Sequence, residues 1–323
     1  MKPMFIRSLA AAVTLTLAAT HALAAFPDQA IKITVGFPAG TGPDIVARSV
    51  GDQLGKEVKQ SVVIENKAGA GGQIAAHSVA QSTPNGYSLL LGEVGSISIT
   101  PETTANLGYA PQRDFAPITE AVRANFVLVT PPNSPYNTLE EFVKAAKTSK
   151  EEFNIATFGA GTPGHFGAEL LAEAGKFKIV PIHYRSTGEA VTAIVSGQVQ
   201  GAFVTTALAA PQLAGGKMKA LAITGSERTK MLPNVPTFAE SGMPDVNFGA
   251  WFAFFAPAGT PAAVLTQLNQ DLVKSLKAPG VTKLLEDNGF VVVGSSREAL
   301  ADLLVTEQKL WSDVVKKTGF KIN

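Results

Sequence analysis

Two glycine-rich loops, each between a predicted strand and a predicted helix, carry the clearest chemical signal in the sequence. They cover residues 39–44 and 159–165. Where a strand ends and a helix begins, backbone N–H groups and the positive end of the helix dipole point outward, so an anion can be held without Lys or Arg. One such loop is as readily explained as a tight turn. Two of them predict a grip on opposite ends of a small carboxylate.

Residues 159–164 also spell G-x-G-x-x-G, the fingerprint of a dinucleotide-binding loop. The strand that follows ends near Arg185 with no acidic residue to hold a ribose, although Arg185 would suit a 2′-phosphate. Thr162-Pro163 inside the loop and an export signal at the N-terminus argue against a nicotinamide cofactor. No Lys-containing phosphate loop is present, so we expect no nucleotide cofactor.

Catalytic patterns are weak. The chain has no G-x-S-x-G elbow and no Cys, so neither a serine-hydrolase elbow nor a thiolate can be assigned. His165 and Glu169 are four residues apart and share a helix face, but without a third convergent ligand a structural histidine is expected rather than a metal site. We expect His183 in the core or cleft and His77 on a helix surface. Glu93 follows a buried strand and either lines a cleft or pairs with a cation at its rim.

Composition indicates a folded protein with small partners. Of the 323 residues, 46% are hydrophobic and 16% are charged, so the chain can bury a large core. The 27 basic and 26 acidic side chains nearly balance, which excludes the electrostatic footprint of a nucleic-acid binder. Without Cys, stability has to come from packing and not from disulfides.

The N-terminus predicts export. Lys2 and Arg7 precede a short apolar stretch over residues 9–19, and the small residues at 22 and 24 suit a signal peptidase. The alternative, a membrane anchor, needs an apolar run of about 20 residues, and this run is shorter. We therefore expect a cleaved signal peptide at 1–24 and a soluble periplasmic protein.

The elements that position the loops alternate between strand and helix, which predicts an α/β protein with parallel βαβ units. Expected strands cover 31–37, 62–65, 88–91, 126–130, 154–158, 179–184, 199–204, 220–224, 251–256 and 290–293; expected helices follow residue 42 and cover 73–81, 138–148, 165–170, 188–196, a stretch after 260 and a long stretch after 296. The roughly 300 residues after the signal are expected to form two domains.

An ordered set of motifs resembles a known family. The chain is similar to Bug-type receptors, the extracytoplasmic solute-binding components of tripartite tricarboxylate transporters, over essentially its whole mature length. The motifs that carry the resemblance are Phe37-Pro38-Ala39-Gly40 with Gly42 and Asp44, Glu65-Asn66-Lys67 with Gly69-Ala70-Gly71-Gly72, Gly86-Tyr87-Ser88-Leu89-Leu90, Arg113-Asp114-Phe115-Ala116-Pro117, Gly161-Thr162 with His165, Leu232-Pro233-Asn234-Val235-Pro236-Thr237, and Ala256-Pro257-Ala258-Gly259-Thr260-Pro261.

The resemblance implies a two-lobed type II periplasmic-binding-protein fold that closes on a carboxylate in a cleft between the lobes. Residues 25–122 with 250–323 would form lobe 1, and residues 123–249 would form lobe 2. It also implies a monomer that delivers its ligand to membrane permease subunits, without a cofactor and without catalysis. Chain crossings near 121–124 and 249–251 would form the hinge.

The same resemblance implies a ligand site made largely of backbone N–H groups. Phe37 and Phe158 would flank the cleft and favour an aromatic carboxylate or a medium-chain dicarboxylate, because aromatic faces stack on flat bodies. The implied ligand-binding residues are Phe37, Ala39, Gly40, Thr41 and Asp44 in the first loop; Phe158, Gly159, Gly161, Thr162 and His165 in the second; and Ser186, Gly188, Thr205 and Thr206 in two later segments.

Two other function classes stay open from the sequence. An exported enzyme could use the glycine-rich loops for a phosphorylated or nucleotide ligand. A sensory receptor could bind the same carboxylates and hand its closed form to a membrane kinase.

Overall fold

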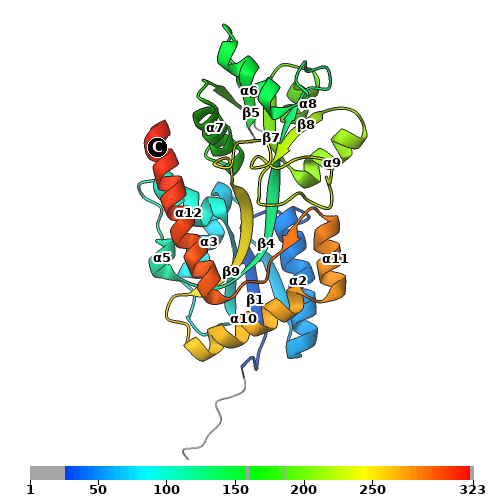
Figure 1. Cartoon of the computed structure of the whole chain (residues 1–323). Helices are drawn as coiled ribbons and strands as arrows, with labels where there is room; N and C mark the ends of the chain where they lie inside the picture. Colours follow the sequence, from blue (N-terminus) through cyan, green and yellow to red (C-terminus); the bar gives the residue numbers. More distant parts are fainter. Residues whose placement is uncertain (1–25, 158–159, 185–186, 321–323) are drawn as a thin grey trace, which may run out of the picture.

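The computed structural model describes residues 26–157, 160–184 and 187–320. They form two lobes stacked end to end, with a long C-terminal helix along one side (Figure 1). The predicted signal peptide, Phe158, Gly159, Arg185 and Ser186 lie outside the described residues.

Lobe 1, the lower lobe in Figure 1, consists of a sheet with helices on its faces. Its strands are β1 (Ile31–Val35), β2 (Val62–Asn66), β3 (Ser88–Glu93) and β10 (Val291–Val292). Its helices are α2 (Gly42–Val58), α3 (Gln73–Ala80), α4 (Thr100–Thr103), α5 (Pro111–Asp114), α10 (Ala262–Leu276) and α11 (Pro279–Asp287), with a 3₁₀ turn at Ala70–Gly72 and a π-helical turn at Gly95–Ile99.

Lobe 2, the upper lobe, is one continuous stretch of the chain. In chain order it contains α6 (Leu139–Thr148), β5 (Asn154–Thr157), α7 (Pro163–Gly175), β6 (Val180–His183), α8 (Thr187–Val195), β7 (Gly201–Thr205), α9 (Thr206–Ala214) and β8 (Lys219–Ile223). Parallel pairing of β1 with β2 and β3, and of β5 with β6 and β7, confirms the predicted βαβ units.

Two antiparallel strands connect the lobes, β4 (Phe115–Thr130) and β9 (Gly249–Pro257). The sequence predicted only residues 126–130 of β4, but the strand has 16 residues. Its first part pairs with β9 and β10, and its last part pairs with β7 and β8. Register shifts at Pro117/Thr119 and Glu120/Val122 interrupt its pairing with β9. Such bulges bend and twist a strand, so a single strand can belong to both lobes.

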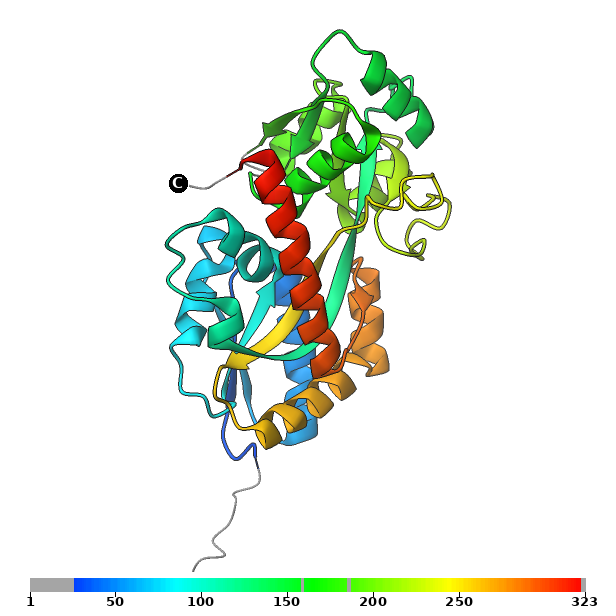
Figure 2. The ribbon, with the colours of Figure 1, turned by 60° about the vertical axis from the view of Figure 1, so that its left-hand side comes forward.

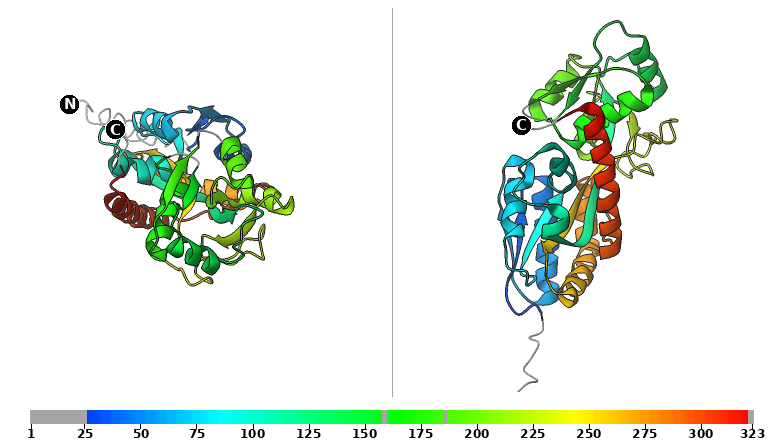
Figure 3. Two further views of the ribbon diagram at one scale, coloured as in Figure 1. Left: turned by 90° about the horizontal axis from the view of Figure 1, so that it is seen from above. Right: turned by 90° about the vertical axis from the view of Figure 1, so that its left-hand side faces the viewer.

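The helix α12 (Arg297–Thr318) lies along both lobes, as Figures 2 and 3 show from two sides. Its start follows from the sequence: the hydroxyl of Ser296 accepts a hydrogen bond from the Ala299 N–H at 3.1 Å. Trp311 is fully buried, and near the C-terminal end Lys317 pairs with Glu173 of α7 in lobe 2. The lobe boundaries expected from the sequence therefore stay a prediction, since α12 contacts both. Among the described residues, no helix is both long and apolar enough to cross a bilayer.

One hydrophobic core runs through the connection between the lobes. It joins Phe166 and Phe248 of the lobe 2 side with Trp251, Phe255 and Trp311. Separate clusters fill the remaining parts of each lobe. The side chains at the crossing are therefore packed as an interior and not as a linker.

Candidate functional site

The first glycine-rich loop connects β1 to α2. Ala39 and Gly40 are exposed, whereas Phe37 is half-buried against the core of lobe 1. The Thr41 hydroxyl donates to the Pro38 carbonyl at 2.7 Å and does not cap α2. Because the first amides of a helix have no intrahelical acceptor, the N-terminus of α2 keeps its capacity to bind an anion or water.

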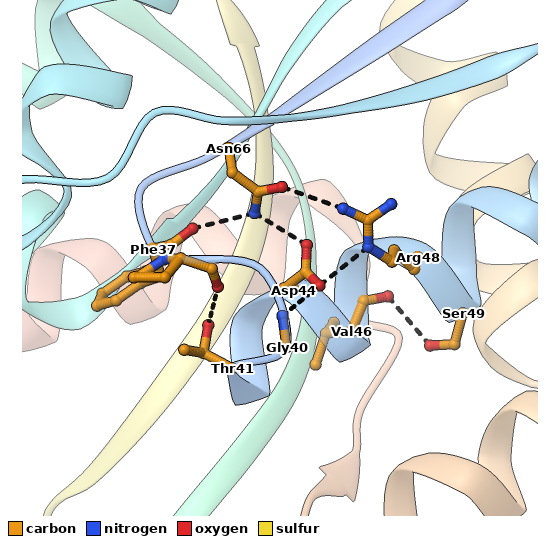
Figure 4. Close-up of polar contacts among 9 residues, drawn as sticks. Phe37, Gly40, Thr41, Asp44, Val46, Arg48, Ser49 and Asn66 are labelled. Atoms are coloured by element: carbon orange, nitrogen blue, oxygen red, sulfur yellow. Dashed lines mark hydrogen bonds and ion pairs between the residues drawn. The ribbon is translucent and has the colours of Figure 1, made fainter.

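Asp44 lies behind this loop and holds it in place (Figure 4). Its carboxylate accepts hydrogen bonds from the Gly40 N–H at 2.8 Å, from Arg48 Nε at 2.9 Å and from Asn66 Nδ2 at 2.9 Å. Asn66 Nδ2 also donates to the Phe37 carbonyl at 3.0 Å. The network thus ties both ends of the loop to β2 and α2.

Electrostatics keeps this carboxylate charged. Burial, with a residue exposure of 3%, would raise the pKa of Asp44. The hydrogen bonds from Arg48, Gly40 and Asn66 outweigh burial and lower the pKa from 3.8 to about 2. Asp44, predicted as a ligand contact, therefore has its carboxylate engaged by the protein itself.

The second glycine-rich loop leads into α7. The Thr162 hydroxyl accepts from the His165 N–H at 3.4 Å and caps the helix, and Pro163 occupies the first helical position, where no N–H is needed. His165 Nδ1 accepts from the Gly161 N–H at 3.1 Å. Gly161 has φ +74°, a backbone conformation that favours glycine. His165 thus fixes the loop from behind, as Asp44 does in lobe 1.

The surroundings of His165 keep it neutral. Its ring stacks on Phe166 with the ring centroids 4.9 Å apart, and it meets the His183 ring edge-to-face with the centroids 4.7 Å apart. Burial, helped by the charge of His183, lowers the pKa of His165 to about 4. His183, expected in the core or cleft, is exposed and its Nδ1 lies 2.6 Å from the Thr157 hydroxyl. Glu169 Oε1 is 3.9 Å from His165 Nε2, and in the described part of the chain no further group joins them in a metal-binding cluster.

The helix α9 brings a third N-terminus to the same region. The Thr205 hydroxyl caps α9 by accepting from the Leu208 N–H at 3.4 Å. Together, the starts of α7 and α9 line a pocket of about 260 Å³. The pocket is lined by Phe126, Thr162, Pro163, Gly164, Phe203, Val204, Thr205 and Leu208. Thr162 and Thr205, which the sequence placed in one site, thus lie in one pocket.

Contacts across the lobes connect this pocket with the first loop. The buried Thr206 donates its hydroxyl to the Gly289 carbonyl of lobe 1 at 3.3 Å. The next residue, Phe290, lies so close to the start of α2 that a Cβ added at Gly42 would be 3.0 Å from its Cζ. The N-termini of α2 and α9 therefore approach the same short segment.

The remaining expected ligand-binding residues are Gly188 and three residues outside the described part of the chain. Gly188 is exposed on α8, and an added Cβ there would meet nothing within 4 Å. Phe158, Gly159 and Ser186 fall outside the described residues. Sequence reasoning missed Arg48 and Asn66. The spacing of Arg48, one helical turn after Asp44, was a readable signal for an ion pair.

The carboxylate of Glu93, for which the sequence left two roles open, is bound by backbone groups of the protein itself. Glu93 is buried, and its carboxylate accepts from the Gly95 and Ser96 N–H groups, each at 2.7 Å. Burial raises its pKa, although these hydrogen bonds oppose the shift. Glu93 therefore caps the π-helical turn that follows β3.

Residues 46–320 match the model of the tripartite tricarboxylate transporter family receptor. The chain belongs to this family. The curated relative BugT from Bordetella pertussis is 29% identical to the chain over 298 residues, which cover 92% of this receptor and 91% of BugT. Both sequence comparisons confirm the resemblance to Bug-type receptors.

Solved structures confirm the mixed α/β, two-lobed fold. The periplasmic binding protein BugD has a TM-score of 0.75 and 31% identity, covering 92% of this receptor and 99% of BugD. MatC from Rhodopseudomonas palustris, solved with bound malate, has a TM-score of 0.74 and 33% identity, covering 90% and 100%. Rpa4515 from R. palustris, solved with adipate, has a TM-score of 0.78 and 27% identity, covering 92% and 99%.

Proposed function

We propose that this protein is a periplasmic receptor that binds an organic carboxylate and delivers it to the membrane subunits of a tripartite transporter. The observation that carries the proposal is the arrangement of three helix N-termini: the first turns of α7 and α9 line one pocket, and α9 and the start of α2 in lobe 1 both lie against the short segment of Gly289 and Phe290. Three positive dipole ends favour an anion there. Malate bound to MatC and adipate bound to Rpa4515 support the ligand class.

Binding in this proposal depends on neutral donors. The ligand carboxylate accepts hydrogen bonds from loop amides near Ala39 and near Gly161 and from the threonine side chains at the starts of α7 and α9. Asp44 and His165 act as positioning residues because their polar atoms hold Gly40 and Gly161. Phe158, Gly159 and Ser186 keep the ligand contacts expected from the sequence.

The lobes move as the ligand binds. Residues 25–122 with 250–323 and residues 123–249 are the proposed lobes, and β4 and β9 supply the hinge. Loops on opposite lobes hold one small anion only when the lobes approach. The ligand therefore shifts the population from open to closed by its difference in affinity for the two states.

The proposed cellular compartment is inferred from the relatives. Family members are solute-binding receptors, and BugD is described as a periplasmic binding protein. We infer the same compartment for this chain, with residues 1–24 as the cleaved signal, a monomeric receptor and no catalytic reaction.

The first test uses calorimetry with a panel of organic carboxylates and nucleotides. A carboxylate at 100 times its dissociation constant should stabilise the native state by about 2.7 kcal/mol. Stabilisation by nucleotides and not by carboxylates would contradict the proposal. Small-angle scattering at saturation should give a smaller radius of gyration, and an unchanged radius would exclude closure on binding.

A matched pair of variants tests the first loop. Ala39 is exposed, so its replacement leaves the core intact. Ala39→Asp adds a negative charge beside the N-terminus of α2, whereas Ala39→Asn has the same shape without the charge. The Asp variant should bind the carboxylate at least tenfold more weakly than the Asn variant. Equal affinities would remove the first loop from the anion site.

A further inference from the structure

The pocket at the starts of α7 and α9 is largely apolar. Phe126, Phe203 and Leu208 form part of its wall, together with Val204 and Pro163. Its polar side chains are Thr162 and Thr205, and each hydroxyl accepts the N–H of its own helix. No charged side chain is among the described residues that line it.

The aromatic walls of this pocket are held rigid from behind. The ring centroid of Phe248 lies 5.3 Å from that of Phe126 and 5.1 Å from that of Phe203. Phe203 also stacks on Phe238, with the ring centroids 5.7 Å apart. Phe203, Phe238 and Phe248 are buried, and Phe248 fits against Gly167, where an added Cβ would come within 2.0 Å of its ring. Because close-packed rings cannot shift freely, the pocket keeps its volume of about 260 Å³.

This volume and lining suit a hydrocarbon body. An apolar cavity of about 150 Å³ accepts benzene, so this pocket has room for a ring or a chain of about six carbons. A second carboxylate placed among Phe126, Phe203 and Leu208 would lose its water without gaining a cation from the described residues that line the pocket, which is strongly unfavourable. The pocket therefore discriminates against an acid with charges at both ends.

We propose that the ligand is a monocarboxylic acid with an aromatic or aliphatic body. This inference rests on the proposed carboxylate-receptor function and specifies its substrate class. The carboxylate faces the helix N-termini, and the apolar body fills the pocket between α7 and α9. Leu208 is a specificity-determining residue because it lies in the pocket wall and is only half-buried.

The test compares hexanoate with adipate, which have the same six-carbon chain and differ in the second carboxylate. Phenylacetate serves as the aromatic probe. Isothermal titration of the mature protein should give at least tenfold tighter binding for hexanoate or phenylacetate than for adipate. Leu208→Asn should narrow the ratio of hexanoate to adipate affinity at least fivefold. The matched control, Val305→Asn, changes a residue of α12 that is 70% exposed and should leave the ratio unchanged.

The outcomes separate this inference from the function on which it rests. Adipate binding as tightly as hexanoate and phenylacetate, or more tightly, would overturn the monocarboxylate assignment and leave the receptor function standing. A preference for hexanoate that Leu208→Asn does not change, in a variant with unaltered circular dichroism, would overturn the assignment to this pocket. Absence of binding by every carboxylate tested would overturn the receptor function itself.

Discussion

Replacing Asp44 with Asn should destabilise the protein by an amount that follows from its hydrogen bonds. The pKa of Asp44 is lowered from 3.8 to about 2, and one pKa unit corresponds to ~1.4 kcal/mol, so the charged carboxylate contributes about 2 kcal/mol at neutral pH. In Asp44→Asn, the amide keeps one acceptor oxygen where the carboxylate has two, so at least one of the donors on Gly40, Arg48 and Asn66 faces an N–H group, and the charge that pairs with Arg48 is lost. We expect the free energy of unfolding to fall by about 2 kcal/mol at pH 7.

The stability difference between the native protein and Asp44→Asn should depend on pH. A carboxylate with a lowered pKa in the folded state stabilises the protein fully above the pKa of the unfolded chain, and the contribution is lost as the pH falls through the folded pKa. The difference between the native protein and Asp44→Asn should therefore be constant from pH 7 to about 5. It should decrease to roughly half at pH 3.

Urea denaturation followed by tryptophan fluorescence measures both quantities, since Trp251 and Trp311 are buried. Asp52→Asn is the matched control, because Asp52 is an exposed carboxylate on the same helix and its loss should change stability by less than about 0.5 kcal/mol. An Asp44→Asn variant as stable as the control at pH 7, or a deficit that does not change with pH, would refute the role given to this network.

Three further predictions test the packing and the second loop. Gly167→Ala should lower the free energy of unfolding by about 1–3 kcal/mol or more, because its Cβ would lie 2.0 Å from the Phe248 ring and overpack the core. Gly188→Ala, where the added Cβ meets nothing, should leave this free energy unchanged or raise it by about 0.5 kcal/mol. Equal effects of the two substitutions in urea denaturation would contradict this packing. Because the pKa of His165 is lowered to about 4, the unfolded chain takes up a proton that the folded chain does not as the pH falls from 6.5 to 4. The free energy of unfolding of the native protein should therefore fall by about 2 kcal/mol more between pH 7 and pH 5 than that of His165→Gln. Identical pH dependences of the two proteins would disprove this. Thr162→Ala should lower the free energy of unfolding by about 1 kcal/mol through loss of the helix cap and should also weaken carboxylate binding. Thr162→Ser, which keeps the hydroxyl, should retain both the stability and the affinity in thermal unfolding and titration. A Ser variant as impaired as the Ala variant would show that the hydroxyl has neither role.

Local patterns predicted most of the elements correctly. The capping hydroxyls of Thr138 and Ser296 lie at the starts of α6 and α12, where a short side chain followed by an apolar helical face marks a helix start. The buried Leu265, Leu268 and Leu272 share one face of α10, as their spacing predicted. These features depend on residues within one or two helical turns.

Long-range pairing accounts for what the sequence missed. Thr119, Glu120 and Arg123 gave the first half of β4 a polar character, yet it is a strand because β9 pairs with it from more than 120 residues away. Thr119 donates its hydroxyl to the Ser295 carbonyl at 2.8 Å, and the Glu120 N–H donates to the Ser295 hydroxyl at 2.9 Å. The polar groups are thus satisfied by partners that no local window contains.

The candidate site divides in the same way. The two glycine-rich loops were predicted from the sequence, because a turn between strand and helix has a local signature, and their threonines were implied by the family resemblance. Asn66 was not, since its contact with Asp44 joins residues 22 positions apart. The pocket wall was not either, because Phe126, Phe203 and Leu208 come together only when β4, β7 and α9 are assembled.

The shared strand β4 has a consequence for how the protein unfolds. Its backbone is hydrogen-bonded to β9 in one lobe and to β7 and β8 in the other, and the core around Trp251 and Trp311 continues across the crossing. Melting either lobe would leave its half of β4 without partners and would expose the part of the shared core that packs against the other lobe. The two lobes should therefore lose their structure in one cooperative transition, and a fragment cut at the crossing would expose part of this shared core.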